Sequence, residues 1–109
     1  MQEHHIIPKS LFGLLLGEKY ELLTGSTILL PEDEREARQN DKVIYHVSHP
    51  NYNEQVERLL MRHSSSDTCI DIDTETLEEL IQSIRGRINF IHEEWGEIAS
   101  IDELSLEDI

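Results

Sequence analysis

Cysteine, long apolar runs and positive charge are all scarce in this 109-residue sequence, and each shortage excludes a class of protein. Cys69 is the only cysteine, so the chain can form neither an intrachain disulfide nor a four-cysteine zinc site. The longest apolar stretch, residues 11–16, is far shorter than the ~20 residues that span a bilayer. The N-terminal residues show no basic segment followed by an apolar core, so we expect no signal peptide and no membrane partner.

Acidic residues dominate the charge of the chain. Nine Lys/Arg stand against 23 Asp/Glu, which gives a formal net charge of −14. Residues 1–63 hold ten acidic and seven basic residues, a charge of −3, whereas residues 64–109 hold thirteen and two, a charge of −11. The protein therefore lacks the basic surface of a typical DNA-binding domain, and any action on nucleic acid requires a locally neutral or positive site.

A polar break at residues 63–68 divides the chain into a first part, residues 1–63, and an acidic helical extension, residues 64–109. In the extension, apolar residues recur at steps of four and three, which is typical of an amphipathic helix, and Asp73 is its expected cap. The apolar residues are Leu77, Ile81, Ile84, Ile88, Ile91 and Trp95. We expect this stripe to pack on the chain's own core; the alternative is a partner or homodimer contact through residues 77–95.

The first part reads as short elements separated by proline, glycine and polar residues. We expect a strand within residues 3–8 and another at 27–30, each ended by a proline. A short helix over residues 11–16 would end at Gly17. A longer helix starts at Pro50, is capped by Asn51 or Asn53, and runs to about His63.

Four of the six histidines lie in two pairs, His4-His5 and His46-x-x-His49. Successive side chains of a strand point to opposite faces, so we expect one of His4 and His5 to face a metal and the other a substrate. Neutral imidazole binds divalent metals and suits general base catalysis near neutral pH. Such groups fit hydrolysis of a phosphodiester bond at a single-metal site. The plainer alternatives are an exposed histidine-rich N-terminus and a histidine that neighbours a helix cap.

Other polar side chains have a plain structural interpretation. We expect His63 and His92 to lie at the surface. Arginines in the two longer helices either form a phosphate-facing patch or, as we favour, helix-surface ion pairs. They are Arg58, Arg62, Arg85 and Arg87.

Three segments together resemble the AHH nucleases, a branch of the HNH/endonuclease VII superfamily. They are His4-His5-Ile6-Ile7-Pro8-Lys9, then Ser26-Thr27-Ile28-Leu29-Leu30-Pro31, then His46-Val47-Ser48-His49-Pro50-Asn51-Tyr52-Asn53. Their order and rough spacing agree with the family, and the resemblance covers about residues 3–62. It implies an α+β fold with a small ββα-metal, treble-clef-like HNH core, followed here by the long amphipathic C-terminal helix.

The resemblance also implies roles for individual residues. His4 and His49 would be metal ligands, and His46 a further ligand or a phosphate contact. His5 would be the general base. Ser26 stands where the family has an asparagine that fixes the loop and orients the base, and serine replaces only part of that hydrogen bonding. The cofactor implied is one divalent metal ion: Mg, Mn, Ni or Zn.

As a function, the resemblance implies a metal-dependent endonuclease of the bacterial toxin type, with DNA favoured over RNA. It would act in the cytoplasm after delivery as part of a secreted toxin, with an immunity protein as partner. The alternative is a weak or inactive nuclease relative that keeps the metal and binds proteins through its acidic C-terminal segment.

Overall fold

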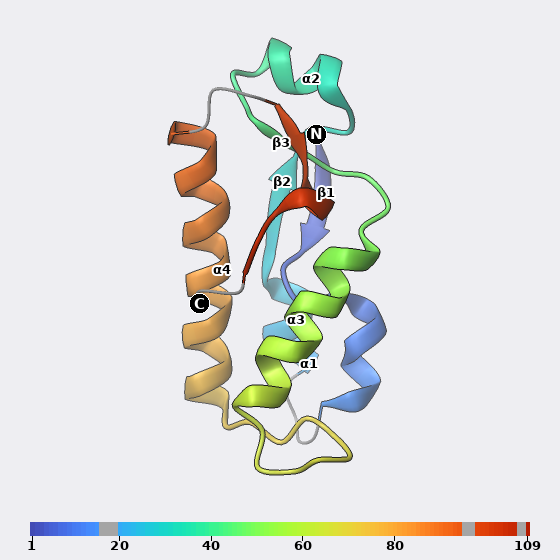
Figure 1. Ribbon diagram of the computed structural model, residues 1–109, viewed down its shortest axis with the longest axis vertical. Coiled ribbons are helices and arrows are strands. Elements are labelled where there is room, and N and C mark those ends of the chain that lie inside the picture. The colour runs from blue at the N-terminus through green and yellow to red at the C-terminus, as the bar shows by residue number, and fades with distance from the viewer. Residues whose placement is uncertain (16–19, 95–97, 107–108) are drawn as a thin grey trace.

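The computed structural model describes residues 1–15, 20–94, 98–106 and 109. It is a mixed α+β structure in which α4, Thr74–Glu94, forms one long edge, with a strand hairpin and α3, Pro50–Arg62, beside it (Figure 1). The predicted α+β class and the long C-terminal helix are therefore confirmed. None of the described helices is long and apolar enough to cross a membrane.

The hairpin consists of β1, Gln2–His5, and β2, Thr27–Leu30, which pair antiparallel with His4 opposite Ile28. The expected first strand is therefore too long at its C-terminal end. Ile6 and Ile7 follow the strand in a bend and are completely buried, so their apolar character serves the core instead of the strand pairing.

Between these strands the chain forms a 3-10 helix, Lys9–Leu14, and then α1, Tyr20–Gly25. The expected helix over residues 11–16 is thus shifted and tighter. Leu11 is buried but Leu14, the last residue of this 3-10 helix, is 40 % exposed, although residues three apart share a face of such a helix. Gly17, its expected end, lies outside the described residues.

The helix α3 starts at Pro50 and ends at Arg62, as the sequence predicts. The predicted cap is wrong: His49 occupies the N-cap position, and the asparagines at 51 and 53 lie inside the helix. Pro50 at the first helical position explains this start, because its fixed backbone angle and missing N–H suit that position. The buried face of α3 consists of Tyr52, Val56, Leu59 and Leu60.

The apolar stripe of α4 packs on the chain's own core, as expected. Leu77, Ile81 and Ile88 are completely buried in one cluster with residues of the first part of the chain. Asp73 caps the helix by accepting a hydrogen bond from Thr76 N at 3.2 Å. Trp95, the last residue of the predicted stripe, lies outside the described residues. A homodimer through residues 77–95 would have to use another face of this helix.

The C-terminal segment returns between α4 and α3 and joins distant parts of the chain (Figure 1). Its strand β4, Ala99–Ser100, pairs in parallel with β3, Ile44–Tyr45. In the 3-10 helix that follows, Ile101–Glu103, a carboxylate oxygen of Asp102 accepts the Tyr52 N–H at the start of α3. The polar stretch between β2 and β3 carries α2, Glu34–Gln39.

Candidate metal centre

Three histidines from three separate elements converge beside the hairpin. His4 comes from β1, His46 follows β3, and His49 caps α3. One ring nitrogen of each lies within 4.8 Å of the others, and the ring centroids are 5.0–5.2 Å apart. The His46 N–H donates to the Pro31 carbonyl at 2.7 Å, which joins the His46–His49 loop to the end of β2. All three predicted metal ligands therefore lie together.

His4 is the buried member of this cluster. Its side chain is 1 % exposed, and neither ring nitrogen has a hydrogen-bond partner among the described residues. Burial, reinforced by the neighbouring His49 and His46, lowers the pKa of His4 to about 3, so the ring is neutral at physiological pH. Buried polar groups normally have a hydrogen-bond partner, and a neutral imidazole can instead donate its nitrogen lone pair to a metal ion. The donor set therefore fits a metal ion.

The other two histidines each have one ring nitrogen engaged. His46 Nδ1 lies 3.0 Å from Oε1 of Gln2, and His49 Nδ1 lies 2.7 Å from Oδ1 of Asn53. A carboxamide oxygen only accepts, so both Nδ1 atoms carry the proton and donate. The Nε2 lone pair of each ring then remains for a metal, the arrangement common among ligating histidines. Burial also lowers the pKa of His46.

Tyr52 packs behind the histidines and links α3 to the end of β1. Its ring makes edge contacts with His4, 4.9 Å between centroids, and with His49, 5.5 Å. Its hydroxyl donates to the Ile6 carbonyl at 2.5 Å, and burial raises its pKa far above the ordinary value. The phenol therefore stays protonated and acts as a structural donor.

His5, next to His4 on β1, lies outside the metal cluster, as strand alternation predicts. Its ring lies edge-on to Phe12 at 6.0 Å, and its buried Nδ1 has no partner among the described residues. His5 lines a cavity of about 290 Å³ together with Lys9, His46 and His49. The predicted base and two predicted ligands thus face one space. Its remaining lining residues are Glu3, Pro8, Ser10 and Asn53.

Ser26 is buried at the turn into β2. Its hydroxyl donates to the Leu22 carbonyl at 2.6 Å, and its own carbonyl accepts the Ile6 N–H at 3.0 Å. The hydroxyl bond joins the residue before β2 to α1, and the backbone bond joins it to the segment after β1. The expected roles of the Ser26 side chain, fixing the loop and orienting the base, stay predictions.

His92 has a role that the sequence analysis missed. It was expected at the surface, as His63 is, but it is half-buried and its Nδ1 accepts N–H groups of Val43 at 3.0 Å and Ile44 at 3.4 Å. Burial, with a smaller effect of Lys42, lowers the pKa of His92. The bond ties α4 to the strand that leads into His46. No local signal marks a contact between residues so far apart in sequence.

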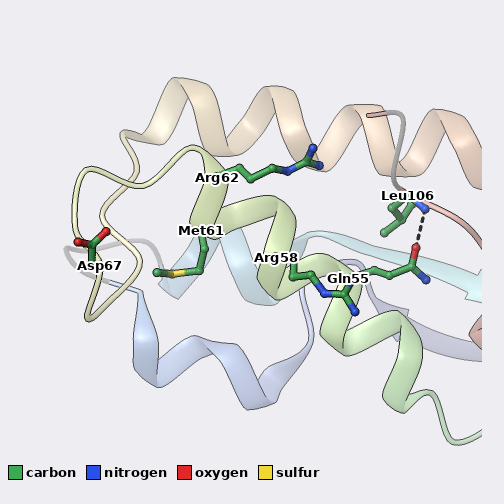
Figure 2. A pocket seen from close by; sticks show the side chains of 6 residues that line it. All are labelled: Gln55, Arg58, Met61, Arg62, Asp67 and Leu106. Atoms are coloured by element: carbon green, nitrogen blue, oxygen red, sulfur yellow. Dashed lines mark hydrogen bonds between the residues drawn. The ribbon is translucent and has the colours of Figure 1, made fainter.

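A larger cavity, about 560 Å³, lies beside α3 (Figure 2). It contains two of the arginines considered for a phosphate patch, Arg58 and Arg62, but Arg58 pairs with Glu54 at 2.7 Å. Arg85 donates to the Thr27 carbonyl at 2.9 Å, so it too serves the fold. The remaining lining residues are Gln55, Met61, Asp67 and Leu106.

The centre offers three protein ligands among the described residues. Structural zinc sites are usually closed by four protein ligands, whereas catalytic sites keep three and leave a position open for water or substrate. The three histidines equal in number the protein ligands of a catalytic site. No family model, curated protein sequence or solved structure matches this chain.

Proposed function

We propose that this protein is a metal-dependent endonuclease that hydrolyses phosphodiester bonds, with DNA as the favoured substrate. The observation that carries the proposal is the convergence of His4, His46 and His49 while His5 faces the adjoining cavity. A metal site and a free imidazole beside one space are the two groups that hydrolysis of a phosphodiester needs.

His4, together with the Nε2 atoms of His46 and His49, would hold the ion. A bound divalent ion supplies positive charge for the phosphate and for the oxygen that leaves. The candidate ions are Mg, Mn, Ni and Zn. Imidazole ligands favour zinc and nickel over magnesium by intrinsic affinity.

His5 is the proposed general base. Its ring accepts a proton from a water molecule in the cavity, and the water oxygen forms a bond to phosphorus. The bond from phosphorus to the leaving sugar oxygen breaks, and that oxygen takes a proton from solvent. Strand geometry keeps His5 directed at this cavity while its neighbour His4 faces the metal, so one short strand provides both roles.

Local charge supports an anionic substrate despite the overall charge of −14. The described residues that line the cavity all come from the first 53 positions, and Lys9 offsets Glu3 there. The acidic helix α4 packs against the core and contributes none of them. A divalent ion held by the three histidines would give this cavity a positive charge in an otherwise acidic protein.

The toxin-type context is part of the same proposal: action in the cytoplasm of a target cell and neutralisation by an immunity protein.

One observation favours the second candidate, a metal-containing protein-binding module. The Ser26 hydroxyl is occupied by the Leu22 carbonyl, so it does not reproduce both ends of the family's asparagine.

Plasmid nicking tests the choice between these functions. We expect cleavage that requires a divalent ion, stops with a chelator and is abolished in His5→Ala, while circular dichroism shows an intact fold. His63→Ala, which removes an exposed histidine, is the matched control and should cleave like the wild type. A folded, metal-bound protein that leaves plasmid intact with every ion would favour the binding module. Cleavage by His5→Ala at the wild-type rate would refute the mechanism.

A further inference from the structure

We propose that two carboxamides, Gln2 and Asn53, are positioning residues that set the tautomer and orientation of His46 and His49 for metal binding. The proposal rests on the metal site proposed above and goes beyond it, since it assigns the hydrogen-bonded support of that site. It also predicts that this support is uncharged, because both side chains are amides.

Asn53 has the stronger geometry. It lies one turn after His49 on α3, so the two side chains belong to the same face of one helix end. The 2.7 Å bond from His49 Nδ1 to Asn53 Oδ1 is partly shielded from water. The backbone N–H of Asn53 also donates to the His49 carbonyl at 3.0 Å, which fixes the spacing of the pair. Asn53 therefore holds its histidine from a rigid base.

Gln2 reaches its histidine from β1 of the hairpin. It precedes His4 by two residues on β1, and residues two apart on a strand share a face. The face that presents His4 to the cluster therefore also presents Gln2, whose Oε1 lies 3.0 Å from His46 Nδ1. This bond is exposed, so we expect it to matter less than the bond from Asn53, because water competes for it.

The choice of amides has a consequence for charge. A carboxylate in either position would increase the basicity of the ligand and reduce the net positive charge of the loaded site. With Gln2 and Asn53, the histidine ligands and these two partners all remain uncharged. The net charge of the loaded site would then equal that of the divalent ion. This positive charge would help an acidic protein attract an anionic phosphodiester.

Metal affinity gives the first test. Zinc affinity is measured by competition with a chromophoric chelator for wild type, Asn53→Ala, Asn53→Asp and Gln2→Ala. We expect Asn53→Ala to lower affinity about 10- to 100-fold and Gln2→Ala to lower it less. Asn53→Asp retains the acceptor, so it should bind zinc at least as tightly as the wild type. Asn51→Ala, an exposed asparagine of the same helix, is the matched control and should not change affinity.

The tautomer gives a second test that needs no metal and no activity. Nitrogen-15 NMR of the metal-free protein should show His49 protonated at Nδ1 in the wild type and in Asn53→Asp. In Asn53→Ala the ring should shift toward the Nε2–H form, because the acceptor that selects the tautomer is gone. A purely structural role of Asn53 would leave this ratio unchanged.

The outcomes separate this inference from the proposed function. Equal zinc affinity in Asn53→Ala and the wild type, or an equal loss in Asn53→Asp and Asn53→Ala, would overturn the positioning role and leave the metal site standing. A wild-type protein that binds no zinc, nickel or manganese would overturn both. Altered affinity without nicking activity would support the positioning role and refute only the nuclease.

Discussion

The bond between Tyr52 and the Ile6 carbonyl supports a quantitative prediction about how the site is held. Tyr52→Phe keeps the ring that contacts His4 and His49 but removes the hydroxyl that donates to Ile6 at 2.5 Å. Both residues are completely buried, so the Ile6 carbonyl would lose this donor away from water. Leaving a buried acceptor unsatisfied costs about 1–3 kcal/mol of unfolding free energy.

The measurement is equilibrium unfolding in urea, with thermal unfolding beside it. For a domain of this size, each kcal/mol of lost stability lowers Tm by roughly 4–8 °C. The expected loss of about 1–3 kcal/mol should therefore appear as a clearly lower Tm. Tyr45→Phe is the matched control, because Tyr45 is only half-buried on β3, and its expected change is within about 0.5 kcal/mol. A Tyr52→Phe protein as stable as the wild type would show that the bond has no net value and that the hydroxyl does not hold the end of β1.

Three further predictions concern protonation, metal and core. In chelator, stability should fall as pH drops below 6.5, because burial keeps the pKa of His4 at about 3 in the fold while the unfolded chain takes up the proton. Well above 6.5 His4 is neutral in both states and has no effect on the pH dependence; below 6.5 the loss is at most about 1.4 kcal/mol per pH unit, measured by urea unfolding from pH 7.5 to 5. The lowered pKa of His92 acts in the same direction, so His92→Gln should reduce the pH dependence. Zinc should raise Tm of the wild type but not of His4→Ala, and a zinc-induced rise of equal size in that variant would refute His4 as a ligand. Ile84→Ala should cost about 2–5 kcal/mol, whereas Phe90→Ala, at a residue 56 % exposed, should cost little; similar losses in urea unfolding would contradict the burial of the α4 stripe.

Local patterns in the sequence determined the two longer helices. The apolar steps of four and three predict α4 and its buried face because a helix repeats every 3.6 residues, so the pattern needs no knowledge of its neighbours. Pro50 likewise marks the start of α3. The opposite directions of His4 and His5 follow from strand alternation alone, and the resemblance selected the right three histidines for one cluster.

Only the tertiary structure decided what supports that cluster. The bonds of His92 to Val43 and of Tyr52 N to Asp102 join residues 49 and 50 positions apart, and Gln2 reaches His46 across 44. No periodicity encodes such pairs, because they depend on how finished elements pack and on the loops that close between them. The first strand ends at His5 for the same reason: Ile6 and Ile7 have strand propensity, but burying both of them in the core outweighs continued pairing.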